Sequence, residues 1–396
     1  MPTPNLFRDD VAYTAPEGNL SSDEQAIELV YITDRANATP SSPTAKYNSK
    51  RSTSAAYGVA KVPLNPNVDW EQLTEASTGA HRRIPLRYGN VIASEHGQFP
   101  ESPYLFSVSD GKVVVDPDTL YELHVARENL RQLIVPRLKT RETNDVVMFV
   151  HGFNNTFEYA AQTLSGVWHF LQRRQLPILY SWPSGAGGFR GYFVDRVSGE
   201  FTIFHLKETL RTLFDIPEID NIHIIAHSRG TDVVTSALRE LIIENRGTGK
   251  NTREDFGISN LILAAPDLDY GVITQRLMAE AFGSAFGKIT VYTTAEDKAL
   301  TVSQLLTKGI RFGLLSNDNI GDRDSSILAR VGNVSFVQAQ DIKTLTGHDY
   351  FVSDPAVSSD LLTLINHGAN PGTPERPLIR KNGNFWLLPD HYPKPE

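Results

Sequence analysis

The stretch Ala226-His227-Ser228-Arg229-Gly230 decides how this chain folds. It follows the β-branched run Asn221-Ile222-His223-Ile224-Ile225 and precedes Thr231-Asp232-Val233-Val234-Thr235-Ser236-Ala237-Leu238, which has a helical pattern. Small residues on both sides of Ser228 allow a tight turn, which holds the serine in a strained backbone conformation. The turn also directs the hydroxyl toward free N–H groups at the helix N-terminus. The stretch predicts a nucleophile elbow; the alternative is a serine that caps the helix after an ordinary turn.

Composition limits the classes of protein to which the chain can belong. With 396 residues, 40% of them hydrophobic, it is long enough for a sizeable core. Its 38 basic and 46 acidic residues give a formal net charge of -8, which argues against a nucleic-acid or anionic-membrane partner. The absence of cysteine excludes disulfides, thiolate metal sites and cysteine nucleophiles. No run approaches the roughly 20 apolar residues of a membrane span, and no signal peptide is evident, so we expect a cytoplasmic protein. The sequence carries no signal for an oligomeric state.

Strands and helices alternate along most of the chain. Continuous apolar runs predict buried strands, and apolar residues at helical spacing predict the helices between them. The main expected strands are 145–150, 177–182, 222–226, 259–265, 288–293 and 334–339, and the expected helices are 120–138, 156–172, 204–213, 232–244, 272–282 and 357–365. This alternation predicts an α/β fold with a doubly wound, mostly parallel sheet and helices on both faces.

We expect one domain with two flanking segments. Residues 1–25 are polar and predict an N-terminal arm. The domain is expected to span 26–366, with an N-terminal β-rich part over 26–140 and the core over 141–366. Residues 367–396 are rich in proline and predict an extended tail.

Polar residues gather where the expected parallel strands end. Parallel sheets place their chemistry outside the carboxyl ends of the strands. At these ends stand His151-Gly152-Phe153-Asn154, Ser228, Pro266-Asp267-Leu268-Asp269, Asp297 and Gly347-His348-Asp349. Serine, aspartate and histidine follow one another in the chain order of an α/β-hydrolase triad.

The chain resembles the α/β-hydrolase superfamily and, more narrowly, an uncharacterised bacterial branch grouped with esterases and lipases. The residues that carry the resemblance are Thr33-Asp34-Arg35, Tyr57-Gly58, His151-Gly152-Phe153-Asn154, Tyr180-Ser181-Trp182-Pro183-Ser184, His227-Ser228-Arg229-Gly230, Ala265-Pro266-Asp267 and Asp297-Lys298-Ala299-Leu300. The resemblance implies the α/β-hydrolase fold. Ala226 stands where the superfamily usually has glycine, and alanine is small enough for the turn. Members often insert a lid after the strand that here ends at Asp267. Because only 271–287 separates this strand from the next, we expect no large separate lid domain.

Three residues are expected to form the catalytic triad. Ser228 needs a base within hydrogen-bond reach to become a nucleophile, and His348, in a glycine-containing loop past the last strand, is the expected base. Asp297 fits the usual position of the carboxylate that fixes the histidine tautomer. Asp267 and Asp269 remain alternative acids.

Residues around the triad are expected to bind the substrate. The N–H groups of Phe153 and Arg229 are the expected oxyanion hole, and Gly152 lets this segment approach the substrate closely. Asn154 is expected either to add a side-chain donor or to stabilise its own turn. Aromatic residues near flexible glycines are expected either to line the pocket or to pack their loop onto the sheet: Trp182, Phe189, Tyr192 and Phe193.

These residues predict a serine hydrolase that cleaves small carboxylic esters, with short- to medium-chain acyl groups, through an acyl-enzyme. A lipase, thioesterase, lactonase or amide hydrolase on the same triad remains an alternative, as does a non-catalytic binding protein, because a fold does not fix the acyl group. No metal is expected, since the histidines and carboxylates lack ligand spacing. Hydrolysis through an acyl-enzyme needs only water, so no organic cofactor is expected.

Overall fold

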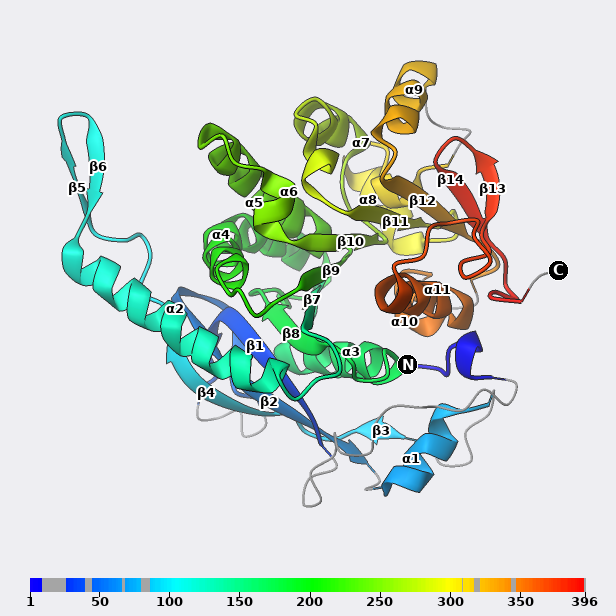
Figure 1. Cartoon of the computed structure of the whole chain (residues 1–396), viewed down its shortest axis with the longest axis horizontal. Coiled ribbons are helices and arrows are strands. Elements are labelled where there is room, and N and C mark those ends of the chain that lie inside the picture. Colours follow the sequence, from blue (N-terminus) through cyan, green and yellow to red (C-terminus); the bar gives the residue numbers. More distant parts are fainter. Residues whose placement is uncertain are drawn as a thin grey trace.

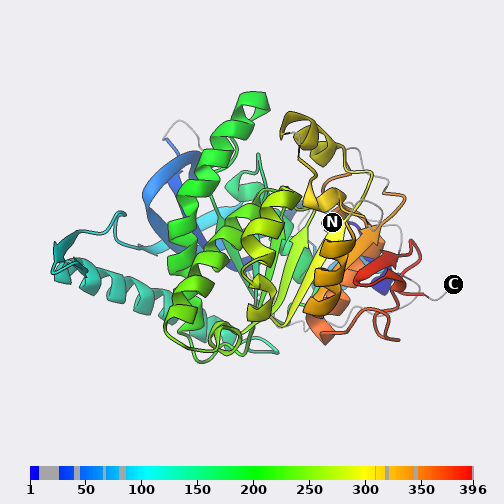
Figure 2. The same cartoon turned by 90° about the horizontal axis from the view of Figure 1, so that it is seen from above.

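A sheet with helices on both faces forms the body of the molecule (Figures 1 and 2). The computed structural model describes residues 1–8, 26–39, 45–65, 68–79, 86–307, 309–316, 321–342 and 347–394. Within these residues the main sheet has twelve strands. Its central strands are parallel and lie in the order β12 (Val334–Ala339), β11 (Lys288–Thr293), β10 (Ile258–Ala264), β9 (Asn221–His227), β7 (Asp145–Val150), β8 (Leu176–Ser181) and β1 (Ala26–Asn37). The prediction of a doubly wound, mostly parallel sheet is confirmed.

Antiparallel strands extend the sheet beyond β1. The long strand β2 (Tyr47–Asn65) pairs with β1 along most of the length of β1. Two further strands, β3 (Arg87–Tyr88) and β4 (Ile92–Gln98), pair with β2. The short helix α1 (Trp70–Ser77) lies in the connection between β2 and β3.

The central strands separate two hydrophobic cores. On β7, Val146 and Met148 face one core, whereas Val147 and Phe149 face the other. The helices that cover the first core are α2 (Pro117–Leu138), α4 (Gly188–Phe214) and α5 (Gly230–Gly247); those over the second are α3 (Phe157–Phe170) and α11 (Pro355–His367). Because both faces are covered, each strand must be apolar at consecutive positions.

Short helical segments occupy the connections between residues 252 and 353. They are α6 (Thr252–Phe256), α7 (Tyr270–Ile273), η3 (Thr274–Met278), η4 (Phe282–Ala285), α8 (Lys298–Thr307), η5 (Phe312–Leu314), α9 (Asp322–Val331) and α10 (Tyr350–Ser353). The expected helix at 272–282 is divided among α7, the π-helical turn η3 and the start of the 3₁₀ turn η4. These short turns fill the connection between β10 and β11.

Helix α4 begins much earlier than expected. The prediction placed its start at residue 204, but the helix already begins at Gly188. Two glycines in its first turns, Gly188 and Gly191, lower the helix propensity and hid this segment. Gly187, with φ 68°, precedes the helix as its N-cap, so a backbone conformation that favours glycine marks the true start.

Both ends of the chain pack against the domain. Part of the expected arm, the turn η1 (Asn5–Phe7), stacks Phe7 on Phe170, while residues 9–25 lie outside the described residues. The expected tail joins the sheet: β14 (Phe385–Leu388) pairs in parallel with β12, and β13 (Ile379–Asn382) pairs with β14. Strands of four residues among prolines give too short a pattern for sequence analysis to detect.

A buried ion pair attaches the tail to α11. Arg376 donates to both carboxylate oxygens of Asp360, from Nε at 2.8 Å and from Nη2 at 2.7 Å. The Tyr292 hydroxyl donates to the same carboxylate at 2.7 Å. Both charged residues are fully buried, with relative solvent accessibilities of 0%. The two charges therefore depend on each other for their stabilisation.

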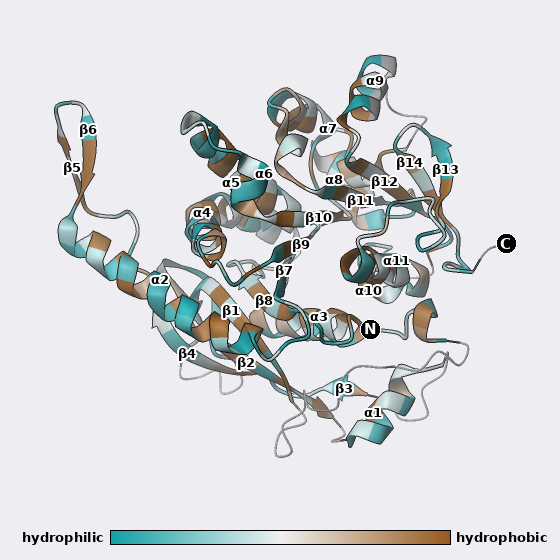
Figure 3. Cartoon of the chain, viewed as in Figure 1, coloured by the Kyte–Doolittle hydropathy of each residue, from teal (hydrophilic) through white to brown (hydrophobic). Residues whose placement is uncertain are grey.

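Hydropathy follows this architecture (Figure 3). The central strands are apolar, and the hairpin of β5 (Phe106–Ser109) and β6 (Lys112–Val115), which projects beside α2, carries exposed apolar side chains such as Phe106 and Val108. In the described ranges, no helix is both long enough and apolar enough to cross a membrane.

Replacing Arg376 tests the buried ion pair. Arg376→Met leaves the Asp360 carboxylate buried without its counter-charge, so we expect the free energy of unfolding to fall by about 3–5 kcal/mol. Urea unfolding followed by circular dichroism measures this loss. Arg380→Met in β13 removes an exposed arginine together with its contacts to Trp386 and Gly383, and is expected to lower the free energy by about 1 kcal/mol or less. Equal stabilities of the two variants would contradict a stabilising role for the buried pair.

Candidate active site

Ser228 lies at a sharp turn between β9 and α5. Its φ is 52°, in the left-handed region that non-glycine residues rarely occupy. The turn is fixed by the neighbouring strand β10, because the Ser228 N–H donates to the Ala264 carbonyl at 2.9 Å. Gly230 is required beside it, because a Cβ at this position would lie 2.6 Å from the Val150 oxygen. The turn has the geometry expected of a nucleophile elbow.

Two short hydrogen bonds connect Ser228 to a histidine and an aspartate. Nε2 of His348 lies 2.7 Å from Oγ of Ser228, and Nδ1 of the same ring lies 2.7 Å from Oδ2 of Asp297. The other oxygen of Asp297 accepts from the Leu300 N–H at 2.9 Å, and Asp297 is fully buried. The carboxylate is therefore held at both oxygens. With a proton on Nδ1, Nε2 of His348 is free to accept the serine proton.

The alternative acids lie elsewhere. Asp267 accepts hydrogen bonds from Tyr192 at 3.0 Å and from Ser303 at 2.7 Å. Asp269 caps α7 by accepting from the Val272 N–H at 3.0 Å. The structure thus brings Asp297 to the histidine, and it gives Asp267 and Asp269 other partners.

His227 holds the loop that carries the expected base. Its Nε2–H donates to the backbone oxygen of His348 at 3.1 Å, and the two rings are 4.9 Å apart. Burial, together with the proximity of His348, lowers the pKa of His227 to about 3. His227 is therefore neutral at physiological pH and positions His348 without competing for the proton.

The expected oxyanion segment lies directly beside Ser228. A Cβ on Gly152 would come within 2.7 Å of the Ser228 Cβ, so only glycine allows this approach. Within the described residues, no hydrogen bond is found from the N–H of Phe153 or from that of Arg229. Two backbone donors therefore remain available near the serine hydroxyl.

A buried arginine supports the oxyanion segment, and sequence reasoning did not assign it this role. Arg35 on β1 donates to Nε2 of His151 at 3.2 Å and to the Asn155 oxygen at 2.7 Å. Because Nε2 of His151 accepts, Nδ1 carries the proton and donates to the Gly152 oxygen at 3.0 Å. Burial and the nearby Arg35 charge keep the pKa of His151 well below its usual value. The only sequence signal was the place of Arg35 within Thr33-Asp34-Arg35.

A cavity of about 540 Å³ opens over the hydroxyl of Ser228. His348 lies in its wall, and most of the other lining side chains are apolar or aromatic, among them Phe149, Phe153, Leu300 and Phe351. This size and lining are typical of small-molecule sites.

Of the aromatic residues expected around the pocket, Tyr192 lines this cavity. Trp182 does not: it is fully buried, stacks on His151 and donates to the His151 oxygen at 2.7 Å. Its size and its indole N–H suit it to support the oxyanion segment from behind. Phe193 is half-exposed outside the lining, and the side chain of Phe189 lies outside the described residues.

Asn154 also lies outside the cavity lining. Its backbone has φ 54°, and its N–H donates to Asp195 at 3.1 Å. Of the two roles expected for Asn154, the structure thus places the residue in a strained turn rather than in the cavity wall.

Comparison with known families agrees with this fold. Residues 126–366 match an alpha/beta hydrolase family of unknown function (DUF900). The chain belongs to this family. The comparison with curated proteins gives no significant match.

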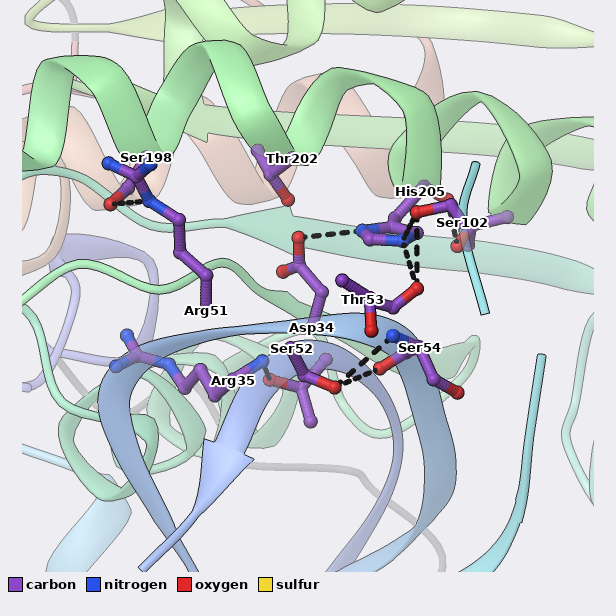
Figure 4. Close-up of polar contacts among 12 residues, drawn as sticks. Asp34, Arg35, Arg51, Ser52, Thr53, Ser54, Ser102, Ser198, Thr202 and His205 are labelled. Atoms are coloured by element: carbon purple, nitrogen blue, oxygen red, sulfur yellow. Dashed lines mark hydrogen bonds and ion pairs between the residues drawn. The ribbon is translucent and has the colours of Figure 1, made fainter. Parts of the chain in front are cut away.

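This alpha/beta hydrolase contains a second arrangement of serine, histidine and aspartate (Figure 4). His205 on α4 contacts Asp34 at 2.9 Å through Nδ1 and Ser102 at 3.0 Å through Nε2. However, the Ser102 hydroxyl donates to the Thr53 carbonyl oxygen at 3.1 Å, so the Ser102 oxygen accepts from Nε2, which also lies 3.2 Å from that carbonyl and therefore carries a proton in addition to the one that Nδ1 shares with Asp34. A protonated nitrogen cannot activate Ser102, and none of the three residues lines the cavity over Ser228. The arrangement instead links α4 to β1 and β2.

In the part of the chain that the structure describes, no group of three or more histidine, aspartate or glutamate side chains could hold a metal ion.

The low pKa of His227 can be tested directly by NMR. We expect its ring nitrogens to keep the 15N shifts of a neutral imidazole from pH 8 to pH 5, because the pKa lies near 3 instead of the usual 6.5. Since the unfolded chain takes up this proton below pH 6.5, the contribution of His227 to stability falls as the pH drops from 6.5 toward 3. The spectrum of His227→Gln identifies the signal. A midpoint between pH 6 and pH 7 for that signal would refute the assignment.

Proposed function

We propose that this alpha/beta hydrolase is a serine esterase that cleaves carboxylic esters through an acyl-enzyme intermediate. The observation that carries the proposal is the pair of 2.7 Å contacts from His348 to Ser228 and to Asp297. A serine hydroxyl is a weak nucleophile until an oriented base takes its proton, and this chain of contacts supplies such a base. The strained serine backbone and the adjacent cavity support the same reading.

In the first half of the proposed reaction, the Ser228 oxygen attacks the ester carbonyl carbon while its proton passes to Nε2 of His348. The negative charge that develops on the carbonyl oxygen is stabilised by the N–H groups of Phe153 and Arg229. The bond to the leaving alcohol oxygen then breaks, and His348 gives its proton to that oxygen. The alcohol leaves, and the acyl group remains on Ser228.

The second half repeats these steps with water. His348 takes a proton from a water molecule, whose oxygen attacks the acyl carbon. When the bond to Ser228 breaks, the proton returns to Oγ and the carboxylic acid departs. Throughout, Asp297 holds the Nδ1 proton of His348 and stabilises the charged ring.

The cavity supports short- to medium-chain acyl groups. Its volume of about 540 Å³ accommodates a small ester, and its apolar lining includes Phe153, Leu300 and Val302. A thioester, lactone or amide could use the same residues. Esters are proposed first because the apolar side chains of the lining offer contacts to an acyl chain.

Removing the nucleophile is the first test. For Ser228→Ala we expect kcat/KM on p-nitrophenyl butyrate to fall by about 10⁴–10⁶-fold, as when a triad serine is removed from other hydrolases. The substitution removes one buried oxygen and keeps the fold, which circular dichroism checks. The same rate in the variant and the wild type would show that Ser228 is not the nucleophile.

Adding one methyl group to the oxyanion segment is a second test. The Cβ of Gly152→Ala would lie 2.7 Å from the Ser228 Cβ, so the segment must move away from the serine. We expect kcat/KM to fall by about 10²–10³-fold, the usual effect of losing an oxyanion donor. Gly247→Ala is the matched control, because nothing lies within 4 Å of a Cβ at that position. Full activity of Gly152→Ala would argue against an oxyanion hole at Phe153.

A further inference from the structure

The cavity over Ser228 has two distinct walls. One comes from α3 and α10 and includes Tyr159 and Phe351; the latter packs on Phe149 with ring centroids 6.0 Å apart. The other comes from α4 and α8, which are joined by the 3.0 Å hydrogen bond between Tyr192 and Ser303. Ser228 opens into the same cavity as both walls. A bound ester can therefore place its two halves against different surfaces.

The position of His348 indicates which wall contacts the leaving alcohol and which contacts the acyl group. In the proposed reaction His348 gives its proton to the departing alcohol oxygen, so the leaving group must lie against this ring. The chain runs from His348 through Asp349 directly into α10. The leaving group thus faces the wall formed by α3 and α10, and the acyl group faces the wall formed by α4 and α8.

The two walls also differ in charge. Among the described residues, the cavity lining contains the carboxylates of Asp267 and Asp349 but no lysine or arginine. Asp267, on the acyl side, is compensated, because Nε of Arg311 lies 3.5 Å from its Oδ1 and Nη1 of Arg229 lies 4.0 Å from its Oδ2. This carboxylate also accepts from two hydroxyl groups. Its charge is therefore balanced within the protein.

Asp349, on the leaving-group side, lacks such compensation. Within the described residues it forms no ion pair, and its side chain makes no capping hydrogen bond to the backbone of α10. Its carboxylate accepts a 3.3 Å hydrogen bond from Ser353. Tyr159 lines the same cavity, and its hydroxyl senses this charge: burial raises the pKa of Tyr159, and the Asp349 charge raises it further. An unbalanced negative charge and an aromatic ring therefore stand on the same wall.

We propose that this site is built for esters of a positively charged alcohol, whose cationic group lies between the Asp349 carboxylate and the Tyr159 ring. The proposal rests on the esterase function proposed above and names its substrate class. A cation gains Coulomb energy from the carboxylate and quadrupole attraction from the ring. A neutral alcohol gains neither, and an anionic one is repelled.

A matched pair of esters isolates this charge. Butyrylcholine and 3,3-dimethylbutyl butyrate have the same acyl group and nearly the same shape, and they differ in a quaternary nitrogen replaced by carbon. Release of butyric acid from each is followed by pH-stat titration. Asp349→Asn removes the charge but keeps an oxygen that can accept from Ser353. We expect kcat/KM for butyrylcholine to fall about tenfold, equivalent to about 1.4 kcal/mol, and that for the neutral ester to change less than about twofold.

The quantity to compare between variants is the ratio of kcat/KM for butyrylcholine to kcat/KM for the neutral ester. Asp349 is adjacent to His348, so an effect of the substitution on the base changes both rates and cancels in the ratio. Glu158→Gln is the control, because it removes a negative charge from the first turn of α3, outside the cavity lining, and should leave the ratio unchanged.

Each outcome distinguishes this inference from the proposed function. A tenfold fall in the ratio for Asp349→Asn alone supports the inference. An unchanged ratio, or turnover of p-nitrophenyl butyrate with no turnover of butyrylcholine, overturns it and leaves the esterase proposal intact. If the wild type hydrolyses none of these esters and Ser228 does not react with a fluorophosphonate, both proposals fail.

Discussion

The left-handed backbone of Ser228 is the constraint on which the site depends. A non-glycine residue in this conformation costs on the order of 1–3 kcal/mol, and its surroundings must hold it there. The Ser228 N–H is bound by the Ala264 carbonyl, and the Ser228 carbonyl accepts from the Thr231 hydroxyl at 2.6 Å. The backbone is packed so closely around Gly152 and Gly230 that the turn cannot move to a more relaxed conformation. Contacts with β7 and β10 thus stabilise the strained backbone at the end of β9, and this backbone directs the Ser228 hydroxyl into the cavity.

Three histidines surround this serine, and their environments separate their roles. His151 is next to the Arg35 guanidinium and His227 is buried near His348, so the pKa of each is lowered and each remains a neutral hydrogen-bonding group. Of the three, His348 has a carboxylate on its ring. Under the proposed mechanism, burial without a counter-charge keeps His151 and His227 out of proton transfer, and the Asp297 carboxylate favours His348 as the base. The selection of one base among three is therefore electrostatic.

Much of this arrangement could be predicted because it depends on local patterns and chain order. The apolar runs of β7 and β9 reflect burial on both faces, and small residues around Ser228 reflect the turn. His348 and Asp297 could be proposed because parallel strands end at one edge of the sheet. Their contact distances could not be predicted, since they depend on loops whose conformation no short pattern fixes.

The residues that sequence reasoning placed wrongly or missed share a different cause. Trp182 was expected either to line the pocket or to pack its loop onto the sheet, and sequence reasoning could not decide because the buried partner of its indole N–H is provided only by the fold. Arg35 is far from the oxyanion segment in sequence and reaches it because β1 lies beside β8. The early start of α4 and the strands of the tail are stabilised by packing against distant segments, which overrides weak local propensity.

The anchoring of His348 also bears on how the protein is made. A ribosome delivers the chain from its N-terminus, so the serine emerges 120 residues, and Asp297 emerges 51 residues, before the histidine. Helix α10 follows His348 and is followed by α11, to which Arg376 in the tail is bound through Asp360. A nascent chain can therefore hold a strained serine beside its oxyanion donors and still lack the base. Under the proposed mechanism, such a chain is inert until the segment that carries His348 has been synthesised and has packed beside Ser228 and Asp297.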